Sequence, residues 1–140
     1  MIIYAYYNSQ GRYVQSGVGP EALTESDIPQ GCQVYYGQVN ITNQYHDVVN
    51  NVPVNMPSSP GEIYVFNYTN KNWELDEEQA KQNAVYKRSQ LLLESDWTQL
   101  PNNPLTAIKQ QEWATYRQAL RDITTQSSYP GTVIWPTKPS

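Results

Sequence analysis

Aliphatic residues are scarce in this chain, and this scarcity limits the size of the core that it can build. Val, Ile, Leu and Phe together account for 28 of the 140 residues, a fraction near the limit below which chains stay disordered. The 12 Tyr and 4 Trp supply much of the remaining apolar surface. Both residue types have a polar edge and are enriched where a protein is buried against a partner. We therefore predict a small folded chain with a thin, largely aromatic core.

The two halves of the chain differ in composition. Residues 1–70 contain a single base, Arg12, with five acids and nine of the 12 Tyr, whereas residues 71–140 contain eight bases, eight acids and all 4 Trp. A chain of this length has room for one domain or for two small units. We predict a Tyr-rich β domain over residues 1–75 and a helical module over residues 76–140.

Charge and cysteine content disfavour several classes of partner. The net charge is −4 and the pI is about 4.8, so the chain has no basic surface for nucleic acid or for an anionic membrane. Cys32 is the only cysteine, which rules out an intramolecular disulfide. The N-terminus lacks the basic start and the apolar stretch of a signal peptide, and no apolar run is long enough to span a membrane. We expect a chain that is neither exported nor anchored in a membrane.

The first half is predicted to form a small antiparallel sheet. Segments rich in Tyr, Val and Ile are separated by clusters of Gly, Pro and Asn, which favour turns. The expected strands are residues 2–7, 33–40, 44–49 and 62–68, and the expected turns are residues 8–11, 17–20, 29–31, 57–61 and 69–72. In the last strand Tyr64, Phe66 and Tyr68 alternate with other residues and therefore share one face. That aromatic face is a candidate partner-binding surface.

The second half has the pattern of two helices. Residues 76–93 contain no Gly or Pro and begin with three acids, which suit a helix N-terminus. After a break at residues 101–104, Thr106 can cap a second helix. The second helix has an apolar stripe at spacings of three and four residues: Trp113, Tyr116, Leu120 and Ile123. An extended Pro-rich tail follows, in which residues 132–135 could add a short strand. The predicted fold class is α+β.

The residues give little support for catalysis or for a metal site. His46 is the only histidine, and neighbouring Asp47 would point to the opposite face of a strand. Cys32 has no basic cluster nearby in sequence to activate it. Residues 76–78 fit a helix start better than a metal site, and residues 17–20 do not match a phosphate-binding loop. We predict no catalytic, cofactor or metal residues, and a function based on binding.

Several motifs in the second half resemble those of tailed-bacteriophage tail assembly chaperones, the tail-fibre assembly protein group. The motifs are RSQLL (88–92), SDWTQLP (95–101), PLT (104–106), WATYRQALRDI (113–123) and IWP (134–136). The resemblance covers about residues 88–136, and residues 1–75 resemble the group only in layout. Within this module the expected anchor residues are Trp97, Trp113, Tyr116, Arg117, Arg121 and Trp135, which either bind the partner or form the core.

The resemblance implies a chaperone that binds the distal end of a trimeric tail fibre and assists its folding and trimerisation. Such a protein acts in the host cytoplasm during assembly, and both release from the fibre and retention in the virion fit the resemblance. The alternative is a structural virion component of the tail, baseplate or fibre tip. A third reading is a carbohydrate-binding module, because faces of Tyr and Trp with Asn and Gln can bind sugars.

Overall fold

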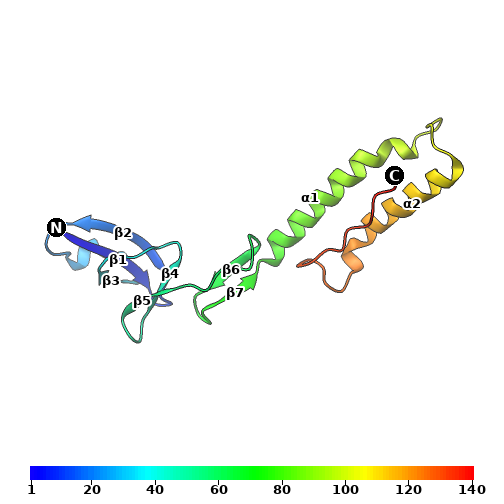
Figure 1. Ribbon diagram of the computed structural model, residues 1–140. Helices are drawn as coiled ribbons and strands as arrows, with labels where there is room; N and C mark the ends of the chain where they lie inside the picture. The colour runs from blue at the N-terminus through cyan, green and yellow to red at the C-terminus, as the bar shows by residue number, and fades with distance from the viewer. The chain divides into compact units, whose positions relative to one another are not determined.

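The computed structural model describes all 140 residues and confirms the α+β class. The chain divides into two compact units, residues 1–74 and residues 75–140. Small antiparallel sheets make up the first unit, and a pair of helices with an extended tail makes up the second (Figure 1). None of the helices is both long and apolar enough to span a membrane.

The first unit is organised around a three-stranded sheet. Its strands are β1 (Ile2–Asn8), β2 (Tyr13–Gly19) and β3 (Cys32–Tyr36), in the order β2-β1-β3. Both neighbours run antiparallel to β1. Three successive residues of this central strand, Ala5, Tyr6 and Tyr7, are buried. Since successive side chains point to opposite faces, the chain covers both faces of β1.

Strand β2 corrects the prediction of a turn at residues 17–20. Gly17 and Gly19 lie within the strand and pair with Tyr4 and Ile2 of β1. A Cβ atom on Gly17 would lie 2.9 Å from the Tyr4 hydroxyl oxygen, and one on Gly19 would lie 3.1 Å from the Tyr4 ring. The glycines therefore make room for an aromatic ring across the strand, and in this sequence they do not mark a turn.

Two hairpins complete the unit. The first joins β4 (Gln44–Asp47) to β5 (Val52–Asn55), and the second joins β6 (Tyr64–Asn67) to β7 (Asn72–Leu75). The turns predicted at residues 8–11 and 69–72 are confirmed. In each, an Asn side chain accepts backbone hydrogen bonds: Asn8 from the amides of residues 10 and 12, and Asn67 from those of residues 69 and 70. Such bonds stabilise a tight turn without a sheet partner.

His46 lies at the centre of the first unit and is fully buried. Its ring stacks on Tyr7 with centroids 3.8 Å apart. Nε2 lies 2.9 Å from Oδ1 of Asn51, and Nδ1 lies 2.8 Å from the hydroxyl of Tyr13. Because the Asn51 oxygen can only accept, Nε2 carries the proton and the Tyr13 hydroxyl donates to Nδ1. A neutral imidazole satisfies both contacts, so His46 is a structural core residue of β4.

The stability of the first unit is expected to fall as the pH is lowered below about 6.5. Burial disfavours the imidazolium and lowers the pKa of His46 from its ordinary value of 6.5. The unfolded chain then binds a proton at a higher pH than the folded chain does, so acid favours unfolding in this window. Thermal unfolding of the β1 amide signals, followed by NMR between pH 7 and pH 5, measures the effect. A His46→Gln variant should lose the dependence, and an equal slope in both proteins would contradict this account.

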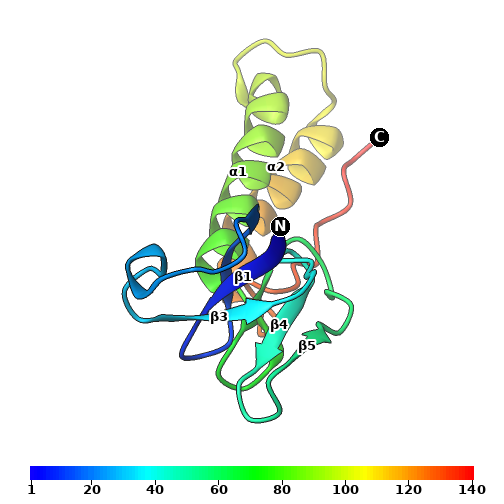
Figure 2. The ribbon, with the colours of Figure 1, turned by 90° about the vertical axis from the view of Figure 1, so that its left-hand side faces the viewer.

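The second unit is a pair of helices that lie side by side (Figure 2). Helix α1 (Glu77–Ser95) is capped by Asp76, whose carboxylate accepts from the Gln79 amide at 3.0 Å. Helix α2 (Ala107–Arg121) is capped by Thr106, whose hydroxyl accepts from the Lys109 amide at 3.3 Å. Both predicted helices and the predicted Thr106 cap are confirmed.

The predicted strand at residues 132–135 does not form. The Gln126 side chain instead donates to the Ile134 carbonyl and accepts from the Ile134 amide, each at 2.8 Å. One side chain thus satisfies both backbone groups that a neighbouring strand would have bound. This pair of bonds fixes the start of the extended tail.

Candidate functional site

The interior of the helical unit is formed by the stripe predicted on α2. Trp113, Tyr116 and Leu120 form a buried cluster against Leu91, Leu92, Leu105 and Trp135. The ring of Trp113 meets that of Tyr116 edge to face, with centroids 5.7 Å apart. Burial raises the pKa of the Tyr116 hydroxyl. Two of the candidate anchors, Trp113 and Tyr116, therefore hold this unit together.

Arg117 joins α2 to the end of α1. Its guanidinium donates to the Leu92 carbonyl at 2.6 Å, to the Ser95 hydroxyl at 2.8 Å and to the Asp96 carboxylate at 2.7 Å. A cation at a helix C-terminus is favoured by the helix dipole and can donate to carbonyls of the last turn. Arg117 is 7% exposed, so this candidate anchor is also a structural residue.

The C-terminal tail packs on the helices through Trp135. The ring of Trp135 is half-buried against the helical core, and the Lys87 ammonium lies 4.6 Å from its centroid. Beyond it, the tail and α2 form an open groove of about 1080 Å³, lined mostly by small and polar residues of α2 and by residues 136–140. Trp135 is thus the residue that ties the tail to this unit.

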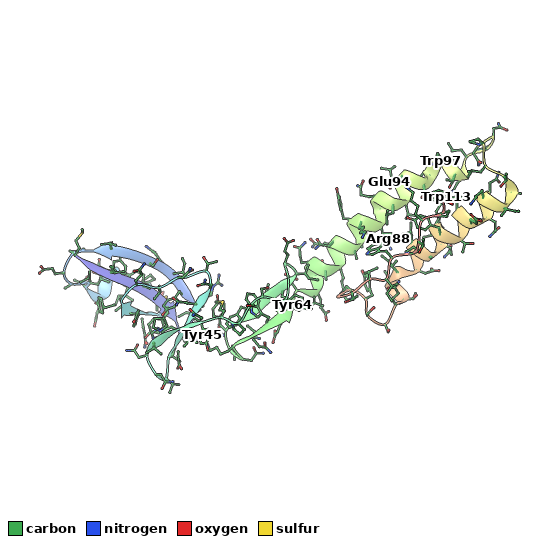
Figure 3. All side chains as sticks on the ribbon, in the orientation of Figure 1. Tyr45, Tyr64, Arg88, Glu94, Trp97 and Trp113 are labelled. Carbon is green, nitrogen blue, oxygen red and sulfur yellow. The ribbon has the colours of Figure 1, made fainter.

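Exposed apolar side chains lie on the face of α1 that points away from the helical core. Tyr86 is 69% exposed and Leu93 is 67% exposed. Shortly after the end of α1, Trp97 is 44% exposed and Leu100 is 60% exposed. A spacing of seven residues places Tyr86 and Leu93 on one line of α1, and Trp97 and Leu100 follow in the 3-10 turn Asp96–Gln99 and directly after it. Trp97 also touches the core, since its ring lies 6.0 Å from that of Trp113 (Figure 3). We call these four residues the outer stripe.

The face of α1 that carries Tyr86 and Leu93 is without charge. The residues beside the stripe on this face are Gln79, Gln82, Ser89 and Gln90. The solvent face of a surface helix normally carries charged residues, whereas depletion of charge with enrichment in aromatic residues is typical of the centre of an interface. This face has the composition of a binding surface.

Of the remaining candidate binding residues, one is exposed to solvent and the others lie in or near an aromatic cluster of the first unit. Arg121 is exposed and contacts only Gln118 of its own helix. In the first unit, Phe66 packs against Tyr45, Tyr68 and Trp73, with centroids 5.1 to 5.7 Å apart. Tyr64 is half-buried at the start of β6. Phe66 and Tyr68 therefore lie on one face, as predicted, and that face is partly used within the unit.

Sequence reasoning missed Tyr86 and Leu93. On another face of α1, Ala80 and Ala84 are buried. The missed signal is the lack of charge on the opposite face of the same helix. No group of three or more His, Cys, Asp or Glu side chains lies close enough together to hold a metal ion.

These features define a helical module with a packed core, in which Arg117 bonds the two helices together, and with an uncharged apolar face on α1. Residues 81–140 match the family described as phage tail assembly chaperone protein. The C-terminal part of this chain is therefore similar to phage tail assembly chaperones, which confirms the resemblance seen in the sequence. Neither the curated proteins nor the solved structures gave a match.

Proposed function

We propose that this chain is a tail-fibre assembly chaperone. It binds the distal end of a tail fibre in the host cytoplasm, keeps the fibre chains from aggregating, and assists their trimerisation. It acts by binding alone and catalyses no reaction. The observation that carries this proposal is the outer stripe on the chaperone domain, because its four large side chains are exposed although the interior of the domain is already packed.

The properties of the outer stripe fit a client that is not yet assembled. Fibre chains expose apolar side chains and strand edges before they trimerise, and such surfaces aggregate. An uncharged face with Tyr, Leu and Trp can cover apolar surface without burying an unpaired charge. The binding energy then comes from apolar burial, which does not depend on a particular pattern of client charges.

The outer stripe is expected to be required for recovery of the fibre. Co-expression of the fibre with the wild-type chain should give a soluble trimer, and a Tyr86→Lys/Leu93→Lys variant should reduce its yield several-fold. Both side chains are exposed, so the double variant should keep the unfolding midpoint of the wild type. Val49→Lys is the matched control, because Val49 is 87% exposed and lies outside the chaperone domain. A fibre that becomes soluble and trimeric equally well without this chain would contradict the proposal.

A permanent place in the virion is the second candidate role. Quantitative mass spectrometry of purified particles separates the two roles. A stoichiometric amount of this chain relative to the fibre favours a virion component, whereas its absence from particles that carry fibres favours a chaperone that is released.

A further inference from the structure

Strand β2 is an open edge of the three-stranded sheet, and the register shows which of its backbone groups face outward. The Gly37 amide donates to the Ile3 carbonyl at 2.9 Å, so Ile3 points its backbone groups toward β3. Tyr4, the next residue, therefore points toward β2, where its partner is Gly17. By the same alternation, Ser16 and Val18 point their N–H and C=O groups away from the sheet.

No strand of the first unit pairs with this edge, although residues 38–41 and Gln44 lie near Ser16 and line a hollow with it. The backbone of Ser16 and Val18 makes no hydrogen bond to a turn, a loop or a side chain. Both residues are exposed, Val18 to 59%. Natural proteins protect edge strands with charges, prolines or bulges. Residues 13–19 contain no charge and no proline, and the one bulge lies at the Tyr13 end of the strand.

The free edge is complementary to itself under a two-fold rotation. An antiparallel copy centred on Gly17 places Ser16 opposite Val18 of the other copy, and Val18 opposite its Ser16. Each of these pairs can exchange two backbone hydrogen bonds. The two Gly17 residues then face each other with no side chains between the backbones. Because the Tyr4 ring lies over Gly17, this arrangement also brings two such rings together above the glycines.

Charge favours an antiparallel over a parallel arrangement of two copies. The segment that follows β2 carries three acids, Glu21, Glu25 and Asp27, and no base. In an antiparallel pair these two acidic segments lie at opposite ends of the joint, whereas a parallel pair would set them side by side. The paired strands themselves bring no charges together. Closed two-fold contacts of this kind are the commonest in protein assemblies.

We infer that β2 pairs with β2 of a second copy of this chain, joining two three-stranded sheets into one continuous sheet. This dimer does not depend on the outer stripe, which lies in the other unit. The partner is defined by the outward backbone groups of Ser16 and Val18 and by the charge-free strand that carries them.

The oligomeric state of the full chain tests the inference. Analytical ultracentrifugation over a range of concentrations should show a reversible monomer–dimer equilibrium. Hydrogen exchange followed by NMR should show the Ser16 and Val18 amides protected only at high concentration. The Gln15 and Gly17 amides, which face β1, should be protected throughout.

Three variants assign the dimer to this edge. Val18→Lys places a charge at the joint, and Val18→Pro removes an outward donor at a position where an edge strand tolerates proline; both should be monomeric with wild-type circular dichroism. Tyr36→Lys is the control, because Tyr36 is 53% exposed on β3, the opposite edge of the same sheet, and should remain dimeric. A wild-type chain that stays monomeric, a dimer that survives both Val18 variants, or loss of the dimer only in Tyr36→Lys would each overturn the inference.

Discussion

Replacing Arg117 by Ala is expected to destabilise the helical unit by about 2–4 kcal/mol, the range for a buried, hydrogen-bonded charged side chain. The Leu92 carbonyl would lose one of its two donors and the Ser95 hydroxyl would lose its donor, and the stem of Arg117 would no longer fill the space between the helices. The ion pair itself contributes little, because the Asp96 side chain is 56% exposed and its charge is screened by solvent. Chemical unfolding followed by Trp fluorescence measures the change.

Arg121→Ala provides the matched control for this result. Arg121 lies one turn further along the same helix and is exposed, so its loss should change stability by about 0.5 kcal/mol or less. Equal unfolding midpoints for the two variants would show that Arg117 does not hold the helices. An Arg117→Met variant, which keeps much of the stem but no donors, should fall between Arg117→Ala and the wild type.

Replacing His46 by Ala is expected to destabilise the first unit by about 3 kcal/mol or more, from the cavity and the lost hydrogen bonds together. The Tyr7 ring would lose its stacking partner, and the Tyr13 hydroxyl would lose its acceptor. A unit of this size has a total stability of only about 5 kcal/mol, so much of it should unfold. The dispersion of the β1 amide signals in an NMR spectrum reports the loss.

Val49→Ala is the control for the His46 variant. Val49 lies in the turn that follows the same strand and is 87% exposed, so its loss should leave the β1 signals unchanged. Well-dispersed β1 signals in His46→Ala would contradict the central role of this histidine.

Local signals in the sequence predicted the helices well. The helix caps Asp76 and Thr106 act on amides three residues away, so their effect does not depend on the rest of the fold. The same holds for the turns stabilised by Asn8 and Asn67. The stripe from Trp113 to Leu120 was predicted because helical periodicity places these residues on one face wherever the helix packs.

Strands β5 and β7 were not predicted, and β2 was mistaken for a turn. Each of the first two is four residues long and exists through pairing with a neighbouring hairpin strand. In β2 the glycines favour a turn by local propensity, and only the Tyr4 ring of the adjacent strand explains their presence. Strand assignment depends on cross-strand packing more than on local preference.

The sequence by itself determined the α+β class, the two helices, the Thr106 cap, the hairpin turns and the similarity of the C-terminal part to phage tail assembly chaperones, because these depend on local bonds, on periodicity and on short motifs. Only the tertiary structure decided which of the large aromatic and basic residues are buried. It placed Trp113, Tyr116 and Arg117 in the core of the helical unit and left Tyr86 and Leu93 exposed. The physical reason is that a residue's exposure depends on what packs against it, and contacts between distant segments are not encoded in any local pattern.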